Sequence, residues 1–271
     1  MDASLADPAE REDDLVGALR AAGCVFAEDE AAVLREAAPD EVHLALMTAR
    51  RVAGEPLEQV VGWAEFRGLR VAVEPGVFVP RRRTERVAEL AVHFAQQVEQ
   101  PVMVDLCCGA GAIAMVVEAE VPHARVHAAD IDPAACAVAR RNLRGPVHEG
   151  DLYDALPREL TGRVDILAVN APYVPTGQLD LMPREARLHE HLVALDGGAD
   201  GLDVHRRVAE QAAEWLAPGG SLLLETSPRQ ATSTARWCRS AGLSVTIYTN
   251  DQVRVVRAIS GPSTPSGTIT G

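Results

Sequence analysis

The chain has 271 residues, of which 47% are hydrophobic and 24% charged, and this suits a globular protein with one sizeable core and a smaller attached module. Its formal net charge of -13 would repel a phosphate backbone, so nucleic acid is a disfavoured partner, although a local basic patch is compatible with this charge. The stretch from Met1 to Asp14 is rich in acidic residues and does not resemble a secretory signal, and no apolar run is long enough to span a bilayer. We therefore expect a cytoplasmic protein with no membrane partner.

The five cysteines are odd in number and show neither the paired spacing of a zinc site nor that of a disulfide framework. We therefore expect a reducing compartment and no metal centre.

The first part of the chain is expected to be helical. From Leu15 to about Arg51 apolar residues recur at helical spacing, with punctuation at Gly23 and at Pro39-Asp40, where Asp40 is placed to cap the next helix. Alternation and β-branching between Pro56 and Val79 favour a hairpin. We divide the chain into a helical module (1–55), a hairpin linker (56–80), a main domain (81–260) and a disordered tail (261–271).

Three adjacent arginines, Arg81 to Arg83, precede a helical pattern that runs from Val87 to Val98. Such a run is most often a solvated surface, and the alternative is a site for acidic groups near a pocket, with Thr84 and Glu85 at the helix start.

A glycine-containing turn follows the apolar strand that ends at Leu106, and a helix follows the turn. A second strand, Arg125 to Asp130, ends in an acid about twenty residues later, the offset at which a carboxylate can accept both hydroxyls of a ribose. The last glycine of a phosphate-binding G-x-G-x-x-G is missing, so a nucleoside without phosphate is the better prediction.

After a helix from Pro133 to Leu143, a third short strand, Pro146 to Glu149, runs to Asp151 and Leu152. Asp151 could accept a hydrogen bond from the exocyclic amine of an adenine, and Leu152 could pack on its ring; a capped turn is an equal alternative.

The apolar run Val164 to Val169 reads as a buried strand that ends at Asn170-Ala171-Pro172-Tyr173. An amide, a stiffening proline and an aromatic ring at this edge could hold another flat polar group, and an ordinary turn is the alternative.

Beyond Tyr173 the pattern predicts a long polar loop (176–201), a helix (202–216), a turn at Pro218-Gly219-Gly220, a buried strand (221–225), a helix (228–241) and a final hairpin (243–258). His189 and His191 in the loop favour a solvated or structural role. The whole order predicts a doubly wound α/β sheet that ends in an antiparallel pair.

Taken together, the glycine turn, the ribose acid, Asp151 and the Asn-x-Pro-Tyr loop resemble a class I, Rossmann-like methyltransferase, and more narrowly the HemK-like protein-(glutamine) methyltransferases. The resemblance covers nearly the whole chain, including Phe78-Val79-Pro80-Arg81, Thr84-Glu85 and Glu225. It implies transfer of a methyl group from S-adenosylmethionine to a glutamine side-chain amide of a protein substrate such as a release factor. It also implies a set of cofactor-binding residues: Asp105, Cys107, Cys108, Gly109, Ala110, Gly111, Asp130, Ile131, Asp151, Leu152 and Asn170.

In this resemblance Asn170 and Tyr173 are the catalytic pair, and Asn170, Ala171, Pro172 and Tyr173 hold the substrate amide. The family's signature is Asn-Pro-Pro-Tyr, so Ala171 departs from it, as Cys107-Cys108 departs from the usual glycine at the start of the turn. Ala171 keeps the backbone carbonyl that would accept a hydrogen bond from the amide, so the chemistry should survive and the protein target could differ. The two cysteines are expected to pack in the turn rather than to act as nucleophiles. The rival functions are methylation of an exocyclic amine on a nucleic-acid base, methylation of a small molecule, and a nucleoside-binding regulator without transfer.

Overall fold

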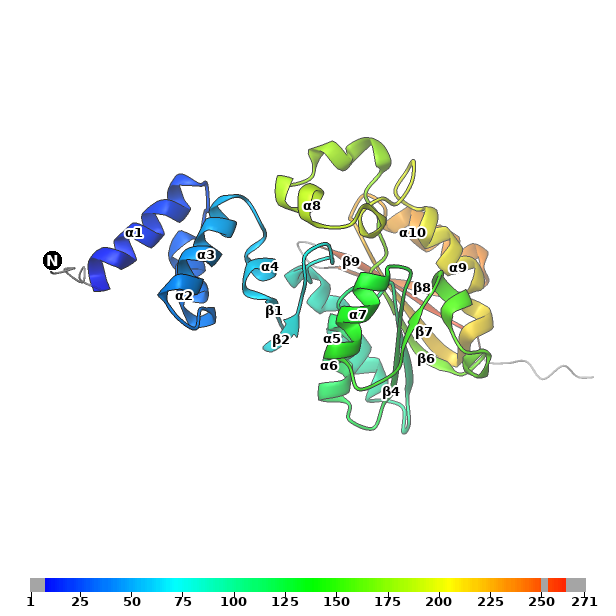
Figure 1. The fold of residues 1–271 in the computed structure, drawn as a ribbon. Coiled ribbons are helices and arrows are strands. Elements are labelled where there is room, and N and C mark those ends of the chain that lie inside the picture. The colour runs from blue at the N-terminus through cyan, green and yellow to red at the C-terminus, as the bar shows by residue number, and fades with distance from the viewer. Residues whose placement is uncertain (1–7, 250–252, 262–271) are drawn as a thin grey trace, which may run out of the picture.

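The computed structural model describes residues 8–249 and 253–261. Figure 1 shows a group of helices at the N-terminal end beside a larger body in which helices flank a sheet on two sides. The tail expected at 261–271 lies outside the described residues apart from Gly261, and so do Asn250 and Asp251 in the turn of the last hairpin. No helix in the described part of the chain is both long and apolar enough to cross a membrane.

The N-terminal helices are α1 (Pro8–Ala21), α2 (Ala27–Ala37), α3 (Glu41–Val52) and α4 (Leu57–Val61). Gly23 follows α1 with a φ of 93°, and Asp40 caps α3, because its carboxylate accepts a hydrogen bond from the backbone N–H of His43 at 2.9 Å. Both local predictions are thereby confirmed. The helices enclose their own apolar cluster, which includes Leu19 and Leu34. The division of the chain at residues 55, 80 and 260 stays a prediction.

The predicted hairpin after these helices is confirmed: β1 (Trp63–Phe66) pairs antiparallel with β2 (Leu69–Ala72). Asn142 fastens it to the main body, because its side chain donates to the carbonyl of Ala72 at 2.9 Å and accepts from the amide of Ala72 at 3.0 Å. The linker therefore enters the larger body at a fixed position.

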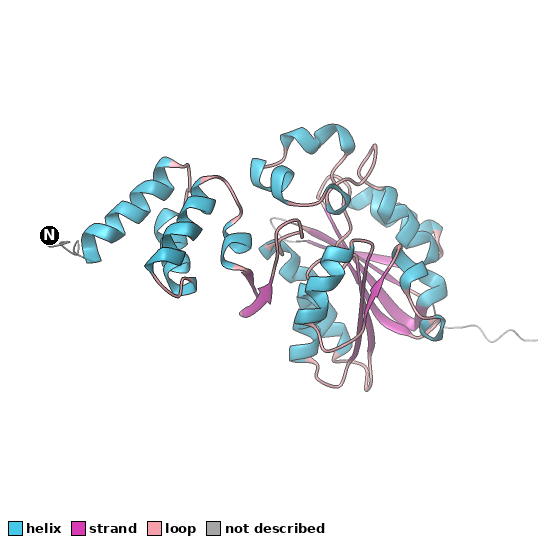
Figure 2. Ribbon diagram, in the orientation of Figure 1, coloured by secondary structure: helices cyan, strands magenta, loops and turns pink. Residues whose placement is uncertain are grey.

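The main sheet has seven strands in the order β5-β4-β3-β6-β7-β9-β8, drawn as arrows in Figure 2. Pairing is parallel from β5 to β7 and antiparallel where β9 joins β7 and β8, so the predicted doubly wound sheet with a terminal hairpin is confirmed. The strands are β3 (Val102–Leu106), β4 (Arg125–Asp130), β5 (Val147–Glu149), β6 (Val164–Val169), β7 (Leu216–Thr226), β8 (Ser244–Thr249) and β9 (Arg254–Ile259).

Strand β7 begins earlier than the sequence predicted. Leu216 already pairs with Val164, and the register shifts before Ser221 pairs with Ile166, so the Pro-Gly-Gly segment forms an irregularity inside a long strand. The prediction of a strand that starts at Ser221 is wrong, because Leu216 already pairs with β6, whereas the predicted turn is present as an excursion within the strand, where Gly219 has a φ of 81°.

Helices cover both faces of the sheet (Figure 1). On one face lie α5 (Glu85–Ala95), α6 (Ala112–Glu120) and α7 (Pro133–Asn142), and on the other lie α9 (Asp203–Trp215) and α10 (Ala231–Ser240). Strands β3 and β6 are neighbours, yet the chain leaves β3 toward β4 on one side and leaves β6 toward β7 on the other. This switch of direction opens a crevice at the carboxyl ends of the strands, where ligands bind in doubly wound folds.

The segment between Thr176 and Gly201 is not the open loop that the sequence predicted. It contains two short 3-10 helices, Thr176–Leu181 and Leu192–Ala194, and the short helix α8 (Arg184–His189). Pro175 and Pro183 stand at the N-terminal boundaries of two of these turns. Turns this short are stabilised by contacts with the rest of the fold more than by local propensity, and for that reason periodicity did not reveal them.

Candidate active site

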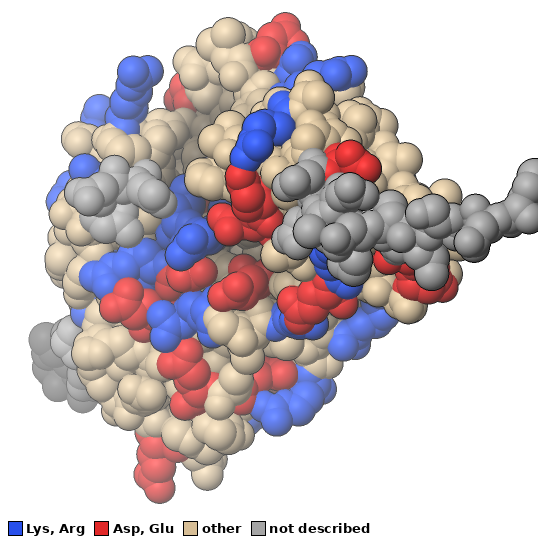
Figure 3. All heavy atoms as spheres, turned by 90° about the vertical axis from the view of Figure 1, so that its left-hand side faces the viewer, with Lys and Arg blue, Asp and Glu red and all other residues tan. Residues whose placement is uncertain are grey.

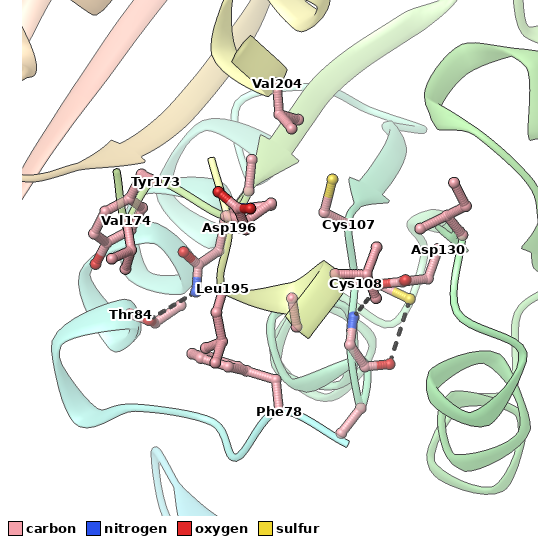
Figure 4. A pocket seen from close by; sticks show the side chains of 18 of the residues that line it. Phe78, Thr84, Cys107, Cys108, Asp130, Tyr173, Val174, Leu195, Asp196 and Val204 are labelled. Carbon is pink, nitrogen blue, oxygen red and sulfur yellow. Dashed lines mark hydrogen bonds between the residues drawn. The ribbon is translucent and has the colours of Figure 1, made fainter. Parts of the chain in front are cut away.

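A cavity of about 530 Å³ lies at the carboxyl ends of β3, β4 and β6, and its lining is mainly apolar. Figure 4 shows Cys107, Cys108 and Asp130 on one side of it and Thr84, Tyr173 and Val174 on the other. We call these sides the nucleoside half and the acceptor half. Twelve of the fourteen residues predicted for the site line the cavity: Cys107, Cys108, Gly109, Ala110, Asp130, Ile131, Asp151, Leu152, Asn170, Ala171, Pro172 and Tyr173.

The nucleoside half is built around the turn after β3. Cys107, Gly109 and Gly111 have φ values of 58°, 55° and 80°, so the turn needs a left-handed backbone at alternate positions. Cys107 adopts this conformation without being glycine, at a cost of roughly 1 kcal/mol. The turn is bound to the neighbouring strand, because the amide of Cys108 donates to the carbonyl of Ala129 on β4 at 3.1 Å.

Asp130 closes the nucleoside half from β4. Its carboxylate accepts from the backbone N–H of Gly109 at 2.8 Å and from that of Asp132 at 2.9 Å. Burial raises the pKa of Asp130, and the two backbone donors act in the opposite direction. The side chain is thus fixed with a carboxylate at the cavity wall, as binding of ribose hydroxyls would require.

Asp105 and Gly111 do not line the cavity but lie behind its wall. Asp105 is 1% exposed; one carboxylate oxygen accepts from the amide of Ala114 at 3.0 Å, and the other has no partner in the described part of the chain. Burial raises the pKa of Asp105 to about 8. A Cβ on Gly111 would come within 2.9 Å of Leu143, so this glycine lets the turn pack on α7. Both residues hold the turn in place.

Asp151 and Leu152 follow β5 and line the cavity together with the half-exposed Ile131. Asp151 is already paired, because its carboxylate accepts from Arg207 on α9 at 2.7 Å. Leu152 is buried with a φ of 50°. The apolar side chains suit a planar base, and Asp151 keeps a second carboxylate oxygen for a polar edge of that base.

Asn170 stands at the end of β6 in the acceptor half and is held from the turn before α5. Its side-chain amide donates to the hydroxyl of Thr84 at 3.3 Å (Figure 4). The hydroxyl of Thr84 also lies near the carboxylate of Glu225 at the end of β7, where it opposes the rise of the Glu225 pKa. Toward Asn170 the hydroxyl oxygen of Thr84 is the acceptor. The amide oxygen of Asn170 is left to accept a hydrogen bond from another group.

Glu225 is fully buried and contacts two other side chains of the acceptor half. It accepts from the hydroxyl of Tyr173 at 3.2 Å and lies 3.4 Å from Nε of Arg83, which also contacts the Tyr173 hydroxyl at 3.2 Å. Burial raises the pKa of Glu225, and the donors Thr84, Arg83 and Tyr173 oppose this. Burial together with Glu225 raises the pKa of Tyr173 to about 12, so the phenol stays neutral and is a positioned ring and donor.

The thiols of Cys107 and Cys108 are protonated, because burial raises the pKa of each well above its ordinary value. A protonated thiol is a poor nucleophile, which agrees with packing as the interpretation of both cysteines. His191 lies outside the cavity lining and contacts Asp132 at 2.6 Å, which agrees with a structural role. Within the described residues no three His, Cys, Asp or Glu side chains are grouped so that they could hold a metal ion.

Arg83 and Thr84 line the cavity, which agrees with the alternative prediction of a site near a pocket for this run. Residues that sequence reasoning did not assign to the site line it too: Phe78, Pro80, Met182, Leu192 to Asp196, Val204 and Arg207. The segment from Leu192 to Asp196 reaches the cavity because it pairs with the Asn170 loop: the amide of Val174 donates to Leu195 at 3.2 Å, and that of Gly197 donates to Val174 at 2.8 Å. A signal was present in the glycines, because a Cβ on Gly201 would lie 2.4 Å from the carbonyl of Tyr173.

The sheet order and the crevice at its switch point define a class I methyltransferase fold. The sequence matches the methyltransferase small domain family over residues 68–189. A methyltransferase from Pyrococcus furiosus has a similar structure, with a TM-score of 0.52 and 17% identity over 72% of this chain and 90% of that one. This likeness shows the fold.

Sequence relatives identify a family within this class of methyltransferases. Release factor glutamine methyltransferases from Streptomyces coelicolor and Geobacter sulfurreducens are 42% and 34% identical, over 68% and 79% of this chain and 67% and 76% of their own. A 4-amino-L-phenylalanine/4-methylamino-L-phenylalanine methyltransferase from Streptomyces pristinaespiralis is 40% identical over 71% of this chain and 68% of its own. The chain belongs to the release factor glutamine methyltransferase family, whose members use S-adenosylmethionine, and the nucleoside half fits the adenosine of that cofactor.

Proposed function

We propose that the protein methylates the side-chain amide nitrogen of a glutamine in a protein substrate, with a peptide chain release factor as the first candidate. The observation that carries this proposal is the orientation of Asn170: Thr84 takes its amide nitrogen, which leaves the amide oxygen to accept an N–H from the substrate. Such an arrangement complements an amide as the group that receives the methyl. The amide oxygen of Asn170 can hold a planar N–H of the substrate without first removing its proton.

The residues of the acceptor half would bind and orient the substrate. The amide oxygen of Asn170 and the carbonyl of Ala171 accept the two N–H groups of the glutamine, and the ring of Tyr173 packs beside it. An amide nitrogen is a weak nucleophile because its lone pair is delocalised, and hydrogen bonds that favour pyramidalisation together with enforced proximity lower the barrier. The apolar lining of the cavity excludes water, which helps a reaction that disperses charge.

S-adenosylmethionine, when bound, supplies an electrophilic methyl group on a sulfonium. In the nucleoside half, Asp130 would take the ribose hydroxyls, and Ile131 and Leu152 would enclose the base. The acceptor nitrogen would form its bond to the methyl carbon as the sulfur–methyl bond breaks, which would leave S-adenosylhomocysteine, and the extra proton of the nitrogen would leave toward solvent.

A labelling experiment tests the proposal. A lysate from cells that lack this protein is incubated with the purified protein and radiolabelled S-adenosylmethionine, and the labelled band is analysed by mass spectrometry. A methyl group on a glutamine of a release factor is the expected result. Label confined to nuclease-sensitive material would overturn it in favour of a nucleic-acid base. Figure 3 shows acidic and basic side chains intermixed on the face that carries the N-terminal helices, without a large patch of basic side chains alone.

The second candidate acceptor is the aromatic amine of a free amino acid. The relative from Streptomyces pristinaespiralis has almost the same identity to this chain as the release factor enzyme from Streptomyces coelicolor. Phe78 and Tyr173 both line the cavity, and aromatic rings can enclose a third ring. Incubation of the protein with 4-amino-L-phenylalanine and labelled cofactor tests this candidate, and absence of labelled product would exclude that amino acid as a substrate.

A further inference from the structure

Arg83 lies beside the pair that would hold the methyl acceptor, and the function proposed above gives it no role. It belongs to the short 3-10 helix Arg82–Thr84, directly before the residue that orients Asn170, and it lines the cavity. Its side chain is 39% exposed. An arginine at this position places a permanent positive charge in an otherwise mainly apolar acceptor half.

Within the described part of the chain, Arg83 makes its hydrogen bond through Nε. Nε contacts the hydroxyl of Tyr173 at 3.2 Å and lies 3.4 Å from the carboxylate of Glu225, and neither terminal nitrogen makes a hydrogen bond to a described residue. The other arginine of the cavity, Arg207, uses a terminal nitrogen to bind Asp151 at 2.7 Å. Arg81 likewise binds Glu190 through a terminal nitrogen. Arg83 therefore differs from both neighbours in keeping its two-pronged end available.

The contacts of Nε fix the guanidinium group from behind. Glu225 is fully buried, and the oxygen that accepts from Tyr173 also lies 3.4 Å from Nε of Arg83, so Glu225 faces the Nε edge of the guanidinium group. A guanidinium group held in this way presents two parallel N–H donors, the geometry that matches both oxygens of a carboxylate.

We infer that Arg83 binds a carboxylate of the methyl acceptor, and that the substrate therefore carries an acidic group close to the nitrogen that is methylated. The inference rests on the proposed function, since it assumes that the acceptor enters this half of the cavity. The carboxylate has two possible sources: an acidic side chain next to the target glutamine of a protein, or the α-carboxylate of a free amino acid. In both cases recognition uses the same pair of charge-assisted hydrogen bonds.

Paired probes that differ in one carboxylate test this inference by binding, without requiring turnover. One pair is an acetylated, amidated peptide with a central glutamine followed by glutamate or by glutamine. The other pair is 4-amino-L-phenylalanine and its α-carboxamide. Dissociation constants are measured by calorimetry with the protein saturated with S-adenosylhomocysteine. In at least one pair the carboxylate member should bind about tenfold more tightly, because hydrogen bonds to charged groups are the stronger ones.

Substitutions test whether Arg83 causes the preference for the carboxylate member of each pair. Arg83→Met should abolish it and Arg83→Lys should retain part of it, because lysine keeps the charge and loses the fork. Arg82→Met is the matched control, since Arg82 is the exposed neighbour on the same turn and does not line the cavity; it should leave the preference unchanged. The dissociation constant of S-adenosylhomocysteine should stay within about twofold in Arg83→Met.

Three outcomes would overturn the inference: no carboxylate preference in either pair, a preference that survives Arg83→Met, or a tenfold loss of S-adenosylhomocysteine binding in that variant, which would assign Arg83 to the carboxylate of the cofactor. The two pairs separate a protein source from a free amino acid. A carboxylate preference without methyl transfer to either preferred probe or to any protein of the lysate would instead refute the proposed function and leave the role of Arg83 standing.

Discussion

The two halves of the cavity are built in different ways. The nucleoside half depends on backbone: two peptide N–H groups hold Asp130, and left-handed turns at Cys107, Gly109 and Gly111 shape the wall. The acceptor half depends on side chains, because the amide of Asn170 donates to Thr84 and the hydroxyl of Tyr173 donates to the buried carboxylate of Glu225 on β7. The first half should therefore govern affinity for the cofactor, and the second should govern turnover and the choice of acceptor.

The largest effect should come from Asn170→Ala. Removing the acceptor of the substrate N–H should lower kcat by about two to three orders of magnitude, as loss of a positioned hydrogen-bonding group at a reacting centre does. The dissociation constant of S-adenosylhomocysteine should change by a few-fold only, because Asp130 and the glycine turn remain. Initial rates and calorimetry measure the two quantities. Retention of full activity would remove Asn170 from the catalytic role, and an equal loss of cofactor affinity would erase the distinction between the halves.

Asp130→Ala should show the opposite pattern. Loss of a carboxylate that accepts ribose hydroxyls should weaken S-adenosylhomocysteine binding by about a hundredfold, since hydrogen bonds to charged groups contribute about 1.5 to 3 kcal/mol. At saturating cofactor the kcat should remain close to that of the unchanged protein. Asp154→Ala is the control, because Asp154 is exposed and does not line the cavity. Affinity unchanged in Asp130→Ala would take Asp130 out of the site.

The nucleoside half was predictable from sequence because its signals are local. A strand, a glycine turn and an acid at the end of the next strand lie between Val102 and Asp130, and their spacing fixes the geometry once the strands are parallel. In the acceptor half the sequence pointed to Asn170 to Tyr173, and to the run from Arg81 to Glu85 only as an alternative to a solvated surface. Arg83 and Tyr173 are 90 positions apart and Tyr173 and Glu225 are 52 apart, and no periodicity relates them. The short helix α8 escaped prediction for the same reason, because its end is held by distant backbone: the amide of Gly76 donates to the carbonyl of His189 at 3.0 Å.

A smaller effect is expected from Thr84, which holds Asn170 from the turn before α5. Thr84→Val keeps the shape of the side chain and removes the hydroxyl, so the amide of Asn170 loses the partner that fixes its orientation. We expect kcat to fall by about tenfold, the equivalent of one hydrogen bond of about 1.4 kcal/mol, with little change in KM. Thr84→Ser restores the hydroxyl and should recover most of the rate. A KM effect alone would mean that Thr84 contacts the substrate directly, and a variant with unchanged kcat would show that Asn170 needs no such partner.

The smallest effect concerns Asp105, which lies behind the wall of the nucleoside half. The pKa of Asp105 is about 8 in the folded protein, against an ordinary value of 3.8. Between these values the unfolded chain has lost the proton that the folded protein keeps, so the contribution of Asp105 to stability is fully present below about pH 4 and is lost as the pH rises toward 8. Asp105→Asn stays neutral throughout. Without cofactor, its Tm should therefore match that of the unchanged protein near pH 4 and exceed it by several degrees at pH 8. Asp154→Asn, at an exposed position, should show no such difference between the two pH values. Equal shifts of Tm at both pH values would mean that folding does not raise the pKa of Asp105.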